Sequence, residues 1–112
     1  MNEQAFDAEI DQLFFTLEQD LEERDPTVDC GTEQGILTIT LQRGEQIILS
    51  RQATRQELWL ACPQGAYHFQ AQIAPTGITW VTRKGEHLEE IIALVFQLAN
   101  IEKKENKNKG EK

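Results

Sequence analysis

The spacing of apolar residues changes twice along this 112-residue chain, and that change constrains the fold more than any other feature. In the first and last segments, apolar side chains recur every three or four residues, which is the period of an amphipathic helix. Between them, residues 35–83 repeatedly alternate apolar and polar side chains, which is the period of strands with one buried face. The predicted order is therefore helix, strands, helix.

The sequence also predicts where each of the two helices begins and ends. The first runs from about Glu3 to Arg24, and Pro26 ends it because the residue before a proline is pushed out of the helical region. Its apolar stripe consists of Phe6, Ile10, Leu13, Phe14, Leu17 and Leu21. The second is predicted over residues 85–101, where three glutamates in the first turn suit the positive end of the helix dipole.

The middle of the chain is predicted to form five or so strands joined by short loops, which favour antiparallel hairpins. The strand segments are 35–42, 47–52, 57–62, 66–73 and 77–83. The fold class is therefore α+β: a two-layer α/β sandwich with the N- and C-terminal helices packed on one face of an antiparallel sheet of about five to six strands. Residues 1–101 form one domain, and the lysine-rich tail 102–112, which has no apolar residue, is predicted to be disordered.

Several classes of protein are excluded by what the sequence does not contain. No apolar run approaches the roughly 20 residues of a membrane helix, and the N-terminus has no secretory pattern, so we expect a cytoplasmic protein. Cys30 and Cys62 lack metal-ligand spacing and are expected to be reduced thiols. His68 is expected on the exposed sheet face. No nucleophile elbow, P-loop or HExxH motif occurs, so no enzyme is predicted.

The formal net charge of −8 is spread unevenly along the chain. Residues 1–33 hold eleven acids and one base, Arg24, whereas residues 34–101 are neutral and the tail carries +2. The acidic segment would repel a phosphate backbone, so nucleic acid is not an expected partner. Cations or a basic protein surface are the natural partners. A monomer is expected in the absence of metal, because the charged surface repels its copies.

Four of these acids form a line along the first helix. On a helical wheel of roughly 100° per residue, Asp7, Asp11, Glu18 and Glu22 fall within an arc of about 60° beside the apolar stripe. Like charges four residues apart destabilise a helix by about 0.2–0.5 kcal/mol per pair, so the line works mildly against stability. It is interpreted either as a solubilising surface or as a cation surface. Fe²⁺, Fe³⁺, Mn²⁺ and Ca²⁺ prefer carboxylate oxygens, and an open line makes several weak sites.

Trp59 is the second unusual feature. By strand alternation it lies on the same sheet face as Glu57 and opposite Leu58, with Ser50 and Gln52 of the preceding strand beside it. A tryptophan on a polar sheet face is typical of an anchor for a protein partner. The alternative is a tryptophan half covered by its own neighbours.

The acidic helix and the segments "GILTITL", "ILSRQ", "ELWLACPQGAYHF" and "WVTRKGEHLEEII" closely resemble, in this order, the frataxin family in its bacterial CyaY form. The resemblance covers nearly all of residues 4–98. It implies the helix–sheet–helix sandwich, weak iron binding through an acidic ridge on the first helix and the edge of the first strand, and contacts with the cysteine desulfurase and scaffold protein that build iron–sulfur clusters. It also implies an iron-responsive modulator, or an iron donor, of that machinery.

Carried over residue by residue, the resemblance assigns two sets of site residues. The acidic ridge comprises the metal candidates Asp7, Asp11, Glu18, Glu22, Glu23, Asp25, Asp29 and Glu33. The partner-binding candidates are Gln52, Glu57 and Trp59. Asp7 stands where some bacterial members carry a histidine. Ser50, Thr54 and Glu57 stand where asparagine, proline and glutamine are usual, so the sequence departs more from the family on the sheet face than on the ridge.

Two functions are therefore expected. The first is an iron-binding protein that modulates iron–sulfur cluster assembly, holding Fe²⁺ or Fe³⁺ weakly, with other divalent cations able to substitute. The alternative is a metal-independent acidic adaptor that binds a basic protein partner through the ridge and Trp59. Slow iron oxidation at loose carboxylate sites is not expected to be the main role.

Overall fold

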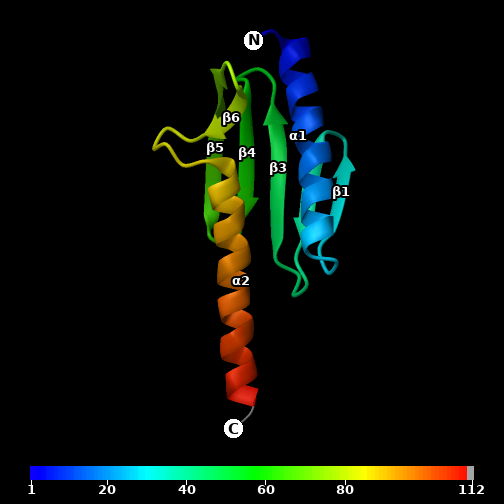
Figure 1. The fold of residues 1–112 in the computed structure, drawn as a ribbon, viewed down its shortest axis with the longest axis vertical. Coiled ribbons are helices and arrows are strands. Elements are labelled where there is room, and N and C mark those ends of the chain that lie inside the picture. Colours follow the sequence, from blue (N-terminus) through cyan, green and yellow to red (C-terminus); the bar gives the residue numbers. More distant parts are fainter. Residues whose placement is uncertain (111–112) are drawn as a thin grey trace.

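The computed structural model describes the backbone of residues 1–110 and the side chains of residues 1–100. Helices α1 (Glu3–Arg24) and α2 (Leu88–Gly110) lie on one face of a sheet, which makes a two-layer α+β sandwich (Figure 1). Within the described residues the sheet has six strands: β1 (Asp29–Glu33), β2 (Ile36–Thr40), β3 (Gln46–Gln52), β4 (Glu57–Cys62), β5 (Gly65–Ala74) and β6 (Gly77–Val81). The predicted fold class is confirmed.

The strands follow one another across the sheet in chain order, and each neighbouring pair is antiparallel. This meander arises from tight connections. Between β1 and β2, Gln34 and Gly35 both have positive φ angles, 52° and 76°, which is the signature of a two-residue type I′ turn. The turn fixes the register in which Glu33 faces Ile36, and with it the face on which every side chain of β1 lies.

The core lies between the helices and the sheet. Alternate residues of β2, β3 and β4 are fully buried against α1 and α2, as are the aromatic rings of Phe6 and Phe69. Phe6 meets Trp80 edge to face, with ring centroids 6.0 Å apart. Full burial of a large apolar side chain contributes roughly 1.5–3 kcal/mol, so this shared layer is what holds the helices on the sheet.

Local capping interactions explain where the helices begin and end. The Asn2 side chain accepts a hydrogen bond from the Ala5 backbone N–H over 2.8 Å and caps α1. At the other end, Asp25 has an extended backbone, in agreement with the stop predicted before Pro26. Helix α2 is capped through the backbone N–H of His87, which donates to the Glu90 carboxylate. Neither helix, among residues 1–110, is long and apolar enough to span a membrane.

Two elements differ from the sequence-based prediction. Strand β1 was not predicted as a strand, because "DCGTE" has no apolar alternation. Helix α2 continues to Gly110, whereas the sequence predicts its end at 101 and a disordered tail over 102–112. The added turns are rich in Lys and Glu, which have high helix propensity, and they extend past the end of the sheet (Figure 1). Residues 111 and 112 lie outside the described part of the chain.

Candidate functional site: an acidic ridge and a tryptophan surface

The N-terminal half of the acidic ridge is joined to the sheet by Arg51 of β3. Its Nη2 donates to Oδ1 of Asp11 over 2.6 Å, and its Nη1 donates to Oδ1 of Asp7 over 3.3 Å. The Arg51 side chain is only 19% exposed, and its guanidinium carbon lies 5.5 Å from the centroid of the Phe14 ring. Asp7 and Asp11 therefore already share a cation.

Sequence reasoning missed this ion pair, although a signal for it was present. Arg51 has the same parity along β3 as Ile47 and Leu49, which are both fully buried beneath the helices. A charged side chain on the core-facing side of a strand needs a partner of opposite charge. The nearest acids are those of α1, which the helical wheel had already placed beside the apolar stripe.

The C-terminal half of the ridge lies where α1 meets the edge strand β1. Glu18 accepts a hydrogen bond from the Thr32 hydroxyl over 2.6 Å, which fixes β1 to the helix. Cys30 has the same parity as Thr32 and faces α1, whereas alternation places Asp29 on the other side of the strand. Burial, together with the carboxylates of Glu22, Glu18 and Asp29, raises the pKa of the Cys30 thiol to about 11.

These three carboxylates, Glu18, Glu22 and Asp29, are called the junction acids below. Within the residues whose side chains are described, Glu22 and Asp29 form no ion pair. The negative charge that adds to burial in raising the pKa of Cys30 is therefore not paired with a described base at Glu22 or Asp29. The junction acids differ in this respect from Asp7 and Asp11, which Arg51 neutralises in part.

The remaining ridge candidates are dispersed. Asp25 follows the end of α1 and accepts hydrogen bonds from the backbone N–H and hydroxyl of Thr27. Glu23 and Glu33 are exposed, the first on α1 and the second at the end of β1. Among the described residues, no three His, Cys, Asp or Glu side chains converge on one point as in a preformed metal centre. The ridge thus offers separated oxygen ligands.

The sheet face without helices carries a row of side chains across four strands. The register pairs Ile36 with Ser50, Ser50 with Trp59, and Trp59 with His68. The Trp59 indole stacks on the His68 imidazole with ring centroids 4.2 Å apart and an angle of 7° between the planes. The predicted positions of Trp59, beside Ser50 on this face, and of His68 are confirmed.

Glu57, one of the predicted partner-binding residues, is buried in this structure and is only 8% exposed. Its Oε1 accepts from the Trp59 indole N–H over 2.9 Å, and its Oε2 accepts from the Gln70 amide over 3.4 Å. The hydrogen bond from Trp59 is the largest cause that lowers the pKa of Glu57, with Gln70 and the charges of His68 and Arg55 adding to it. Glu57 thus holds the Trp59 indole in position. Gln52, the third predicted partner-binding residue, lies opposite Glu57 in the register of β3 and β4.

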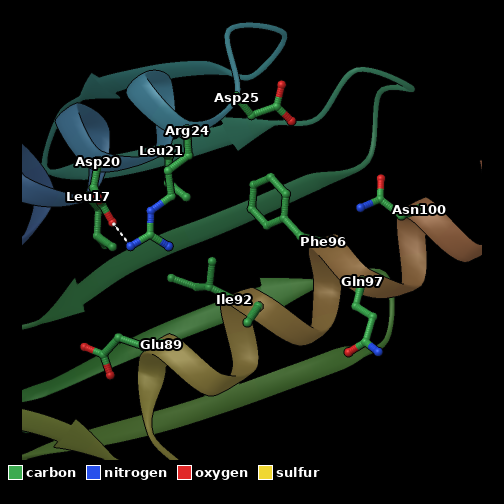
Figure 2. Close-up of a pocket in the computed structure, with 11 residues that line it drawn as sticks. Leu17, Asp20, Leu21, Arg24, Asp25, Glu89, Ile92, Phe96, Gln97 and Asn100 are labelled. Carbon is green, nitrogen blue, oxygen red and sulfur yellow. Dashed lines mark ion pairs between the residues drawn. The ribbon is translucent and has the colours of Figure 1, made fainter.

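A cavity of about 680 Å³ lies between the C-terminal half of α1 and helix α2. Figure 2 shows Leu21, Ile92 and Phe96 along the groove, with the Asp20–Arg24 ion pair at its rim. Of the predicted site residues, Asp25 alone lines it. The groove is on the helix side of the molecule, so it is distinct from the Trp59 surface.

The fold and the acidic ridge define a frataxin-like domain, and the comparisons with known proteins agree. A family model described as a frataxin-like domain matches residues 1–99, so the chain belongs to the frataxin family. The structure is similar to that of frataxin from Psychromonas ingrahamii, described as a model to study stability modulation within the CyaY protein family. The TM-score is 0.75 at 25% sequence identity, over 89% of this chain and 93% of that chain. Membership of this family supports a role in iron–sulfur cluster assembly.

Proposed function

We propose that this protein binds Fe²⁺ or Fe³⁺ weakly, first at the junction acids, and modulates iron–sulfur cluster assembly by docking on the cysteine desulfurase and its scaffold protein. The observation that carries the proposal is the junction of α1 with β1, where Glu18 is held by the Thr32 hydroxyl and no described base pairs with Glu22 or Asp29. Burial, and then the charges of Glu22, Glu18 and Asp29, raise the pKa of Cys30 at this junction. Hard and borderline cations prefer carboxylate oxygens, and a field without a local base is where such a cation gains most.

The order of binding along the ridge follows from Arg51. A metal ion that approaches Asp7 and Asp11 has to displace a guanidinium that already donates to both. An ion at the junction acids meets no such competitor, because within the residues whose side chains are described no base pairs with Glu22 or Asp29. The junction acids therefore fill first, and the N-terminal half of the ridge follows at higher metal concentration.

Separated carboxylates suit a regulatory role. Such ligands leave a bound ion partly hydrated, so it exchanges readily. A protein that reports iron supply, or passes iron on, has to release the ion again. In this proposal the chain is a binding protein in the cytoplasm rather than an enzyme, and the ridge also attracts a basic surface of the desulfurase.

The test is an anaerobic Fe²⁺ titration of ¹⁵N-labelled protein, in which paramagnetic broadening of amide signals locates the ion. The variant E18Q/E22Q/D29N removes the three junction charges, and E3Q/E9Q/E89Q is the matched control with the same change in net charge. We expect broadening around Glu18–Thr32 in the wild type and in the control, and its loss in the junction variant. Equal broadening in both variants would show that net charge, not the junction, determines binding.

The adaptor function is retained as a second candidate because Trp59 is held in place without any metal. Its indole donates to Glu57 and stacks on His68, so the surface is already ordered for contact. The two candidates differ in their response to iron. If the adaptor proposal is correct, desulfurase binding is weakened by salt and by W59A, and is the same with Fe²⁺ as with EDTA. A dependence on Fe²⁺ that disappears in E18Q/E22Q/D29N supports the iron-binding modulator instead.

A further inference from the structure

Two exposed arginines lie at one end of the helix-free sheet face. Arg55 comes from the β3–β4 turn and Arg83 from the loop between β6 and α2. Together with Glu57, His68 and Gln70 they line a cavity of about 290 Å³. Within the part of the chain whose side chains are described, neither guanidinium forms a hydrogen bond or an ion pair.

The strand register brings these residues together from distant parts of the sequence. Glu57 faces Gln70, and Gln70 faces Val81, so the start of β4, the middle of β5 and the end of β6 form one row. The turn that carries Arg55 and the loop that carries Arg83 leave the sheet at this row. The adjacent row contains the stacked Trp59 and His68 rings.

The one acid in the cavity does not neutralise the arginines by direct contact. Both oxygens of Glu57 accept hydrogen bonds from neutral donors, the Trp59 indole and the Gln70 amide. Glu57 is only 8% exposed, whereas Arg55, His68 and Arg83, which line the same cavity, are exposed. What the cavity presents to solvent is a pair of guanidinium groups beside an aromatic stack.

We propose that this cavity binds a carboxylate on an acidic segment of a partner protein, with the Trp59–His68 stack as the apolar contact beside it and Ile36 farther along the same row. A guanidinium offers a planar pair of N–H donors that matches the two oxygens of a carboxylate. Ile36, which is 40% exposed, lies in the same row as Trp59, with Ser50 between them. This docking surface has the opposite sign to the acidic ridge, and it does not depend on iron binding there.

A partner segment fits the cavity better than a free anion does. The chain carries a net charge of −8, so anions are not drawn to it from a distance, and binding depends on local contacts. A small oxoanion would contact only the arginines. A peptide carboxylate brings neighbouring atoms that cover Trp59 and Ile36, and aromatic residues with arginine are typical of the centres of protein interfaces.

The experiment follows the Trp59 indole N–H signal in ¹⁵N-labelled protein during titration with a capped hexapeptide that contains two adjacent glutamates, or with inorganic phosphate. The test variant is R55Q/R83Q. The control R24Q/R43Q removes the same charge elsewhere, on α1 and the β2–β3 turn. A third variant, R55K/R83K, keeps the charge and loses the planar donor pair. All four substituted arginines are exposed, and urea unfolding curves verify the fold of each variant.

We expect the peptide to shift the Trp59 signal, with affinity at least about tenfold weaker in R55Q/R83Q, intermediate in R55K/R83K and within about twofold of the wild type in R24Q/R43Q. Three results would overturn the proposal. The first is that the peptide causes no shift of the Trp59 signal in the wild type. The second is an equal loss of affinity in R55Q/R83Q and R24Q/R43Q, which would indicate that net charge alone determines binding, and the third is phosphate binding as tight as peptide binding, which would indicate a free-anion site.

Discussion

Nη2 of Arg51 donates to Oδ1 of Asp11 across 2.6 Å, and this bond links β3 to α1 over 40 residues of sequence. It divides an acidic ridge that looks uniform in the sequence into two parts. The N-terminal part contains its own cation, which is held over the Phe14 ring. In the C-terminal part, at the junction with β1, burial and then the neighbouring carboxylates raise the pKa of the Cys30 thiol.

Replacing Arg51 by methionine should lower the free energy of unfolding by about 1 kcal/mol. Partly exposed ion pairs contribute about 0.2–1 kcal/mol each, and an arginine over an aromatic ring contributes about 0.5–1 kcal/mol. Part of this is offset, because Arg51 Nε is a buried donor without a partner and methionine removes it. Urea unfolding at neutral pH measures the change. R24Q, which breaks the exposed pair with Asp20, should change stability by less than about 0.5 kcal/mol.

The same R51M variant should bind more divalent cation at the N-terminal end of the ridge. Without the guanidinium, Asp7 and Asp11 become two unpaired carboxylates one helical turn apart, which a metal ion can bridge. An anaerobic Fe²⁺ titration should then broaden the amide signals of Asp7 and Asp11 at lower metal concentration than in the wild type. R51M/D11N is the control, and it should bind no more tightly than the wild type at this end. If R51M leaves the order of broadening unchanged, Arg51 does not compete with the ion.

The sequence could predict which acids form the ridge, but not which base pairs with them. Helical periodicity placed Asp7, Asp11, Glu18 and Glu22 on one side of α1, and that part depends only on local geometry. The contact with Arg51 depends on where β3 lies relative to the helix, which is a property of the whole sheet. On the other face, parity predicted the position of Trp59, but it could not reveal that Glu57 is only 8% exposed and accepts hydrogen bonds from Trp59 and Gln70.

The Cys30 thiol should be unusually unreactive at alkaline pH. Its pKa of about 11, against an ordinary 9.0, is raised first by burial and then by Glu22. A raised thiol pKa contributes stability that is complete below about pH 9 and is lost as the pH rises to about 11. In a C62S background, which leaves one thiol, E22Q should move the pH profile of iodoacetamide alkylation to lower pH. The matched substitution E9Q, on another side of α1, should leave the profile unchanged.

Strand β1 and the end of α2 show why two elements could not be predicted. Neither is determined by an apolar period. Strand β1 is an edge strand whose residues are mostly exposed, and it is held by backbone pairing with β2 and by the hydrogen bond between Thr32 and Glu18. The end of α2 has no apolar residue after Ile101, so the sequence contains helix propensity there but no apolar period. Periodicity detects regularly spaced apolar residues, and both segments lack them.

The hydrogen bond from Trp59 to Glu57 should make stability depend on pH in a predictable way. This bond is the largest cause of the lowered pKa of Glu57, and a lowered carboxyl pKa contributes stability that is present above the ordinary value of 4.5 and is lost as the pH falls below it. W59F keeps an aromatic ring against His68 and removes the indole donor. Its free energy of unfolding should be lower than that of the wild type by about 1 kcal/mol at pH 7, and the difference should shrink toward pH 3. W80F, which changes the buried tryptophan of β6, is the control, and its difference from the wild type should not vary over this range. A W59F difference that is the same at both pH values would mean that the indole supports the sheet by packing alone.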